Sequence, residues 1–242
     1  MAIFGYSPSY GSDQNAALWR ILHCIFTLVH IAFSTPPEDP VKCVSTNADC
    51  TITNSYGAFP DRSTCRAANV AYPTTPAELV SIVATATRSG RKMRVTTRYS
   101  HSMPKLLCTD GRDGLLISTN FLNRTVRTVR SIAKAMTLMV ESGVMLRQLI
   151  DEAAKVGLAL PNAPYWWGLT VGGMMGTRAH GSSLWGKGSA VHDYVTEIMM
   201  VSPGSVNDGF AKVRVLSETA TPDEFNAAKV SLGVLGVISQ VD

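Results

Sequence analysis

The most informative stretch of this chain is residues 161–186, PNAPYWWGLTVGGMMGTRAHGSSLWG. It holds six glycines, a seventh follows at position 188, and hydroxyl residues and one histidine lie between them. A helix or strand this rich in glycine loses much conformational entropy on folding. A glycine-rich loop instead lets peptide N–H groups approach phosphate oxygens, because no Cβ stands in the way. The stretch therefore predicts a loop that binds a large phosphorylated cofactor rather than a packing motif.

Composition sets broad limits on the rest of the chain. The 242 residues are enough for one large or two small domains, and a hydrophobic content of 45% is enough to fill a core. The formal net charge is only +4, and no long basic run is present. Aromatic residues are not interleaved with arginine and lysine, so nucleic-acid binding is not expected.

The N-terminal region has the features of a targeting segment. Residues 21–34 form an apolar run that is shorter than the about 20 residues a membrane span needs. Small residues close the run at Ala32-Phe33-Ser34, as a signal peptidase prefers. We predict a signal peptide over residues 1–34, which places the protein in the secretory pathway, extracellular or in the cell wall, with no membrane span after cleavage. An uncleaved signal anchor is the alternative.

The cysteine count is consistent with secretion. Cys24 leaves with the predicted signal peptide, and an even number of cysteines remains. Their spacings do not match a zinc site, so no metal is predicted. Asn123-Arg124-Thr125 is a glycosylation sequon. The expected disulfides have three possible pairings among Cys43, Cys50, Cys65 and Cys108.

The remaining pattern alternates between helix and strand without a strict βαβ rhythm, which favours an α+β fold. Residues 35–72 show no clear period, and we interpret 35–59 as an extended arm held by disulfides. The box Thr75-Pro76-Ala77-Glu78 begins a helix that ends at Gly90. Further helices are predicted over 146–157 and from 222 to near 233, strands over 93–97, 115–118, 126–132, 135–141, 194–201, 212–216 and 234–241, and a loop over 98–113.

A second segment carries hydroxyl and backbone donors directly after a predicted strand. Residues 94–102, RVTTRYSHS, run from that strand into a short polar loop. Such a loop can surround a pyrophosphate, with Arg98 nearby to offset the charge. A solvated turn with a surface histidine is the alternative. The order of the two loops, about seventy residues apart, is more specific than either loop alone.

With these motifs in this order, residues 60–241 resemble the vanillyl-alcohol-oxidase type of FAD-binding domain, also called the PCMH type. Within that family, the resemblance is to the aldonolactone oxidase group, which includes the plant L-gulono-1,4-lactone oxidases. It rests on residues 94–102, 141–144, 164–183, 188–195 and 231–238.

The resemblance implies a PCMH-type FAD-binding domain over 60–242, with FAD extended between two α+β subdomains. The Thr96–Ser102 loop would bind the pyrophosphate. His101 lies where relatives carry a histidine bonded covalently to the flavin, and His180 would orient the glycine-rich loop or contact flavin. The implied cofactor-binding residues are Thr96, Thr97, Arg98, Tyr99, Ser100, His101, Ser102, Ser142, Gly143, Gly168, Thr170, Val171, Gly172, Gly173, Gly176, Thr177, His180, Gly181, Ser182, Gly236, Val237 and Ile238.

The chain departs from the family pattern in two places. Arg178 stands where the family usually has glycine, which predicts backbone strain if that position needs a positive φ. The C-terminal cap domain, which in the family forms much of the substrate pocket, is expected to be missing. No catalytic residue is therefore named.

The function implied is FAD-dependent oxidation of an aldonolactone, with O2 as the acceptor, giving ascorbate and hydrogen peroxide. FAD carries the chemistry, and the protein supplies placement and electrostatics. Three alternatives stay open: a truncated flavin-binding chain without activity, a sugar or alcohol oxidase of the same fold, and a disulfide-stapled interaction domain without cofactor.

Overall fold

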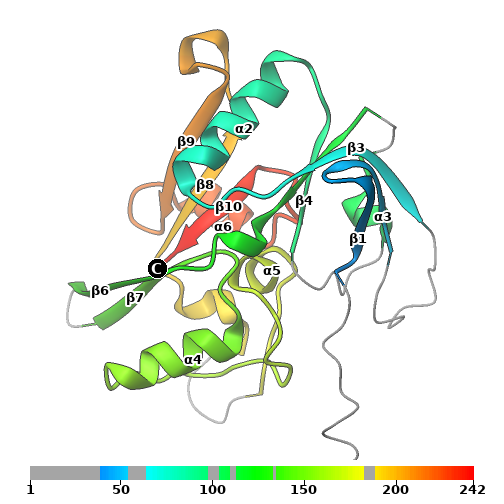
Figure 1. Ribbon diagram of the computed structural model, residues 1–242. Helices are drawn as coiled ribbons and strands as arrows, with labels where there is room; N and C mark the ends of the chain where they lie inside the picture. Colours follow the sequence, from blue (N-terminus) through cyan, green and yellow to red (C-terminus); the bar gives the residue numbers. More distant parts are fainter. Residues whose placement is uncertain (1–38, 54–63, 98–103, 110–112, 133–134, 183–188) are drawn as a thin grey trace, which may run out of the picture. The chain divides into compact units, whose positions relative to one another are not determined.

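The structure is a computed structural model, and it describes residues 39–53, 64–97, 104–109, 113–132, 135–182 and 189–242 (Figure 1). The predicted signal peptide and the predicted loop residues Arg98, Tyr99, Ser100, His101 and Ser102 lie outside the described residues. The described chain forms two five-stranded sheets with helices packed on them, which confirms the predicted α+β class. Among these residues, no helix is long and apolar enough to cross a membrane.

The first sheet has the strand order β1 (Val41–Ser45), β2 (Ala48–Ile52), β3 (Cys65–Ala71), β5 (Leu115–Ser118) and β4 (Met93–Thr96). β1 to β3 are antiparallel, whereas β3 and β4 each run parallel to β5. The region read as an irregular arm therefore supplies two strands of this sheet. These strands gave no clear period because each has only five residues, and few of them are buried apolar side chains, such as Cys50 and Ile52 in β2.

The first helix, α2 (Pro76–Arg88), begins and ends as predicted. The Thr75 hydroxyl accepts from the Glu78 amide at 3.1 Å, and Gly90 follows the helix with a φ of +65°. The buried face of α2, with Leu79 and Val83, packs against residues of both sheets, including Ile117 in β5 and Val201 in the second sheet. One helix therefore shares its apolar face between the two sheets.

The second sheet is antiparallel throughout, in the order β6 (Thr125–Ile132), β7 (Ala135–Glu141), β10 (Val237–Val241), β8 (Glu197–Pro203) and β9 (Ala211–Ser217). These strands agree with the predictions to within three residues at each end. Together with α2 and the first sheet, they form the two α+β subdomains that the resemblance implies.

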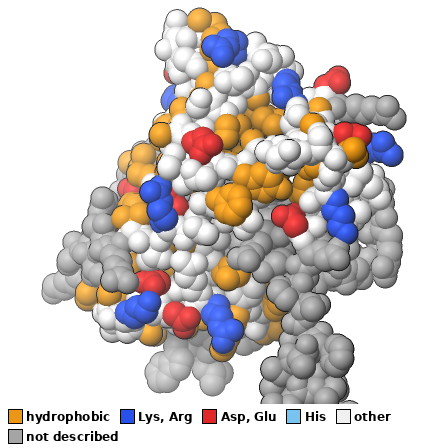
Figure 2. All heavy atoms as spheres, viewed as in Figure 1, with side chains coloured by type: hydrophobic (Ala, Val, Ile, Leu, Met, Phe, Trp, Pro, Cys, Tyr) orange, Lys and Arg blue, Asp and Glu red, His pale blue; other side chains and the backbone are white. Residues whose placement is uncertain are grey.

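Three helices belong to the second sheet's core: α4 (Leu146–Lys155), α5 (Val171–Gly176) and α6 (Pro222–Ala228). Their buried side chains, such as Leu146, Met174 and Phe225, pack in one cluster with the strands. On the face drawn in Figure 2, hydrophobic side chains gather near the middle, and charged side chains of both signs are scattered around them.

Four local predictions need correction. The predicted loop 98–113 contains a short helix, α3 (Pro104–Leu107), and the glycine-rich stretch contains α5. α6 ends at Ala228 and not near residue 233, and β10 begins at Val237 and not at 234. The backbone between them visits positive φ at Leu232, at Gly233 and, with 144°, at Gly236. Neither a helix nor a strand continues through such angles.

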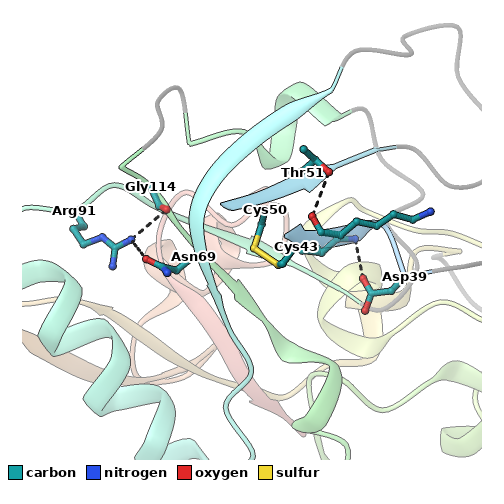
Figure 3. Close-up of a disulfide and its surroundings, with 9 residues drawn as sticks. Asp39, Cys43, Cys50, Thr51, Asn69, Arg91 and Gly114 are labelled. Atoms are coloured by element: carbon teal, nitrogen blue, oxygen red, sulfur yellow. Dashed lines mark hydrogen bonds between the residues drawn. A yellow bond between two sulfur atoms is a disulfide. The ribbon is translucent and has the colours of Figure 1, made fainter. Parts of the chain in front are cut away.

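The four cysteines form two disulfides, so one of the three open pairings is realised. Cys43–Cys50 joins β1 to β2 at residues that are direct register partners (Figure 3). Cys65–Cys108 joins the start of β3 to the residue after α3. Beside them, the Arg91 guanidinium donates to the Asn69 side chain at 2.9 Å and to the Gly114 carbonyl at 3.4 Å, which ties the start of β5 to β3.

Tyr194 is a half-buried anchor whose titration can be measured. Its hydroxyl donates to the Asn162 carbonyl at 2.8 Å. Burial, with a smaller contribution from Asp193, raises the pKa of Tyr194 to about 12. The unfolded phenol ionises first, near its ordinary pKa of 10. This group's stabilisation is therefore complete below about pH 10 and lost as pH rises toward 12.

We expect Tyr194→Phe to lower the free energy of unfolding by about 1 kcal/mol at pH 8, because the hydrogen bond is lost. The variant should also lose less stability than the parent between about pH 10 and 12, since it has no phenol to ionise. Urea unfolding of both proteins across this range measures the difference. Parallel curves for the two proteins would contradict the assignment.

Candidate functional site

A cleft lies where the ends of strands from both sheets meet. It contains about 720 Å³ of empty space, with its open mouth included. Nine of the residues predicted from the sequence line it: Thr96, Thr97, Ser142, Gly172, Gly173, Gly176, Thr177, Gly236 and Ile238. Four separate parts of the chain thus contribute to one site.

The first-sheet side of the cleft is formed by the carboxyl ends of two parallel strands. Thr96 at the end of β4 is the register partner of Ser118 at the end of β5. The chain therefore leaves both strands at the same edge of the sheet. Thr97 and Thr119, which follow these strands, both line the cleft.

The glycine-rich stretch reaches the cleft because its backbone pairs with residues 142–146. The Gly172 amide donates to the Ser142 carbonyl at 2.7 Å, and the Val171 amide to the Val144 carbonyl at 2.8 Å. A Cβ on Gly172 would lie 2.9 Å from the Ser142 Cβ. Glycine at this position is thus required by contact between two segments of this chain.

The expectation that these glycines serve only a phosphate therefore needs correction. A Cβ at Gly181 would lie 2.3 Å from the Ala163 carbonyl oxygen, and one at Gly168 would lie 2.9 Å from the Trp166 ring. Gly176 differs, because no atom lies within 4 Å of its Cβ position and it faces the cleft. Most of the glycines that the structure describes in this stretch allow close packing within the protein, and Gly176 is left free to approach a ligand.

Two hydroxyl groups in the cleft wall lack partners. Ser142 Oγ and Thr119 Oγ1 are buried without a hydrogen bond to another described residue. Ser142 is 0% and Thr119 2% exposed, and both line the cleft. Buried hydroxyls without partners are costly in a folded protein, and they are explained if a polar ligand supplies the missing bonds.

The two sides of the cleft are close to each other. The Cβ position of Gly173 lies 3.7 Å from Thr97 Cγ2, although more than seventy positions separate the two residues in the sequence. The Thr170 hydroxyl accepts from the Gly173 amide at 3.2 Å, and Thr177 Oγ1 donates to the Gly173 carbonyl at 2.8 Å. These bonds stabilise the α5 backbone itself, and Gly173 in that backbone lies beside Thr97 at the end of β4.

The other described residues of the predicted set lie outside this lining. Thr170 caps α5, and the Gly143 amide donates to the Leu122 carbonyl at 2.7 Å. The ring of His180 is exposed, with Nδ1 3.3 Å from the carbonyl oxygen of the adjacent Gly181. The predicted residues outside the lining are Gly143, Gly168, Thr170, Val171, His180, Gly181, Ser182 and Val237.

Sequence reasoning missed six lining residues: Val95, Leu106, Leu107, Thr119, Leu232 and Gly233. Thr119 had a usable signal, because it follows directly after the predicted strand 115–118. Parallel pairing of that strand with 93–97 would have placed it beside Thr97. Leu106 and Leu107 had no such signal, because the sequence predicts a loop over 98–113 and gives no sign of α3.

Arg178 adopts the left-handed backbone conformation, in which an arginine is strained. Its φ is +55°, and its side chain is exposed. It does not line the cleft, although Gly176 and Thr177 do. Burial of the nearby His192 lowers the pKa of that imidazole; Asp193 opposes this shift, and Lys229 and Arg178 add to it. Arginine is thus tolerated beside the site at a conformational cost.

We expect Arg178→Gly to raise the free energy of unfolding by about 0.5 kcal/mol. Relief of the left-handed backbone is worth about 1–2 kcal/mol, and the greater freedom of glycine in the unfolded chain removes about 1 kcal/mol of this. Arg178→Ala is the control, since it removes the same charge without relieving φ, and it should bring no gain. Thermal unfolding of the three proteins decides, and an equal gain in both variants would assign the effect to charge.

A comparison with protein families identifies the class to which this fold and cleft belong. The model described as "FAD binding domain" matches residues 67–205, more than half of the chain. The chain therefore belongs to this family, and FAD is the cofactor of its site. The matched residues include the first-sheet and glycine-rich sides of the cleft.

Similar proteins of known name come from a plant. The chain is 80% identical over 241 residues to "L-gulonolactone oxidase 5" of Arabidopsis thaliana, covering 98% of this chain and 40% of that protein. It is also 80% identical over 238 residues to "L-gulonolactone oxidase 2" of the same plant, covering 98% and 39%. The chain thus spans about two fifths of the length of these relatives.

A solved structure agrees on the fold alone. A "Solvent-stable cholesterol oxidase" superposes with a TM-score of 0.64 at 16% identity, covering 86% of this chain and 39% of that one. At this identity, the similarity carries no information about substrate.

Proposed function

We propose that this chain is the FAD-binding part of an oxidoreductase that converts L-gulono-1,4-lactone and O2 into ascorbate and hydrogen peroxide, and so acts in ascorbate biosynthesis. The observation that carries the proposal is the single cleft formed by residues 96–97, 142, 172–177 and 236–238. The names of the relatives, at 80% identity, supply the substrate. Bound FAD would accept a hydride from a lactone carbon and pass two electrons to O2.

The residues of this chain would bind and orient the cofactor. Thr97 and the backbone of Gly173 and Gly176 line the cleft, and Thr97 lies next to Gly173, so these residues can contact the same part of an extended ligand. Ser142 Oγ and Thr119 Oγ1 offer buried hydrogen bonds. Leu106 and Leu232 give the cleft an apolar part that excludes water from the cofactor.

The test of activity is peroxide formation by the purified protein with L-gulono-1,4-lactone in air, compared with other sugars and simple alcohols. The proposal expects turnover with the lactone. Turnover only with another sugar or alcohol would show that the proposed substrate is wrong and that FAD-dependent oxidation is right. A flat trace from protein with bound FAD would support the second candidate, a flavin-binding chain without activity.

We further propose that His101 carries the flavin covalently, as in related aldonolactone oxidases. The polar loop 94–102 begins at β4, whose last residue Thr96 and next residue Thr97 line the cleft. We expect acid precipitation to leave yellow flavin with the parent protein and to release all of it from His101→Ala. Absorbance of pellet and supernatant measures this. Complete release from the parent would contradict covalent attachment.

We propose that residues 1–34 direct the chain into the secretory pathway, to the cell surface or cell wall. Two disulfides are typical of oxidising compartments, and Asn123 of the sequon is exposed. A mass measurement of the denatured secreted protein reads signal cleavage, the glycan and the disulfides together. A mass that still includes residues 1–34 would favour the signal anchor instead.

A further inference from the structure

The disulfide Cys65–Cys108 lies behind one wall of the FAD cleft. Leu106 and Leu107 of α3 line the cleft, and Cys108 is the next residue. Its partner Cys65 is 4% exposed and is the first residue of β3, where it pairs with Ile52 of β2. The disulfide therefore connects the cleft wall directly to the interior of the first sheet.

α3 depends on such connections for its position. It has only four residues, too few for a helix that is stable by itself. Leu107 and Cys108 pack against a cluster that includes Cys65, Val70 and Leu116. The disulfide and this packing are therefore the contacts that fix where Leu106 lies in the cleft wall.

The two disulfides of the chain differ in what they hold. Cys43 and Cys50 are seven positions apart, face each other across one hairpin and have no neighbour in sequence that lines the cleft. Cys65 and Cys108 are 43 positions apart and close a loop that contains β3, α2, β4 and α3. The hairpin is also held by its ladder of strand pairs (Figure 3).

We propose that Cys65–Cys108 is a positioning disulfide for the flavin site: it holds α3 so that Leu106 and Leu107 complete the cleft wall. The inference rests on the proposed FAD site. Opening the bond takes two electrons and two protons from a dithiol reductant, which becomes a disulfide as Cys65 and Cys108 become thiols. Flavin affinity is then coupled to the redox state of this one pair.

The test compares two double variants, Cys65→Ser/Cys108→Ser and Cys43→Ser/Cys50→Ser, with the parent. All three carry His101→Ala, so that FAD binding stays reversible. Flavin fluorescence quenching during titration of the apoproteins measures Kd. We expect Kd to rise about tenfold in the first variant, as it does when the binding arrangement is populated about a tenth of the time, and to change less than about twofold in the second.

Two results would overturn the proposal: a folded Cys65→Ser/Cys108→Ser protein that binds FAD as tightly as the parent, or equal weakening in both variants. If the first variant does not fold, the protein that carries only His101→Ala is loaded with FAD and reduced stepwise with dithiothreitol under native conditions. Alkylation and mass analysis then identify which disulfide has opened, and FAD release must follow Cys65–Cys108. Release that follows Cys43–Cys50 would contradict the proposal.

Hydrogen exchange of the backbone amides at residues 106–108 in the apoproteins separates this inference from the proposed function. Faster exchange in Cys65→Ser/Cys108→Ser than in the parent supports positioning of the wall even if neither protein binds FAD. Failure of the parent to bind FAD would instead count against the proposed function. Unchanged exchange at these amides would count against the positioning role.

Discussion

Replacing Gly143 by alanine is expected to lower the free energy of unfolding by about 3 kcal/mol. The added Cβ would lie 2.0 Å from the Thr119 carbonyl oxygen and 2.7 Å from that of Leu122. Both are backbone atoms, so neither can turn aside as a side-chain end can. Moving residue 143 away would break the bond from its own amide to the Leu122 carbonyl, which is 2.7 Å long.

Gly157→Ala is the matched control for this prediction. Gly157 follows α4 with a φ of +76°, and nothing lies within 4 Å of its Cβ position. Alanine there should lose only about 1 kcal/mol, the cost of the left-handed backbone. Urea unfolding of the two variants gives their free energies of unfolding, and the difference separates the steric clash at residue 143 from the cost of a left-handed backbone. Equal losses would show that residue 143 has room that the structure does not give it.

The second large effect concerns the two hydroxyls without partners in the cleft. We expect Thr119→Val combined with Ser142→Ala to weaken FAD binding by about ten- to a hundredfold, since each lost hydrogen bond is worth about 0.5–1.5 kcal/mol. The same change should leave the apoprotein as stable as before or more stable, because it removes buried polar atoms that have no partner. Titration with FAD and urea unfolding of the apoprotein measure the two quantities.

Thr125→Val is the control, because Thr125 Oγ1 is also buried without a partner but does not line the cleft. It should match the stability change at Thr119 and leave FAD affinity unaltered. A double variant that loses stability and affinity in proportion would show a general structural effect. The opposite signs of the two effects are what a ligand-binding role requires.

The glycine-rich stretch shows how the sequence can point to the correct site for a partly incorrect reason. Its residues do lie at the cleft, and Gly173 and Gly176 face it. Gly168 and Gly181 are required by Trp166 and Ala163 instead. From the sequence, both uses predict the same small residues, because each needs the absence of Cβ.

Local patterns were enough for most of the helices and strands. The cap at Thr75, the buried run 115–118 and the helical spacing of Leu146, Leu149 and Ala153 depend on neighbours in the chain, and the structure confirms each of them. α3 and the three strands of residues 41–71 were not predicted. β1 to β3 mix small, polar and apolar residues, unlike the apolar run 115–118, and α3 has only four residues.

The sequence by itself determined the α+β class, the capped helices and the two segments that meet at the cleft, because these follow from propensity, period and motif order within short windows of chain. Only the tertiary structure decided that Thr119 lies beside Thr97, that Cys65 pairs with Cys108, and that Gly143 has no room for a methyl group. Each of these depends on a contact between residues far apart in the chain, and the positions of such residues are set only when the two sheets and α2 pack together.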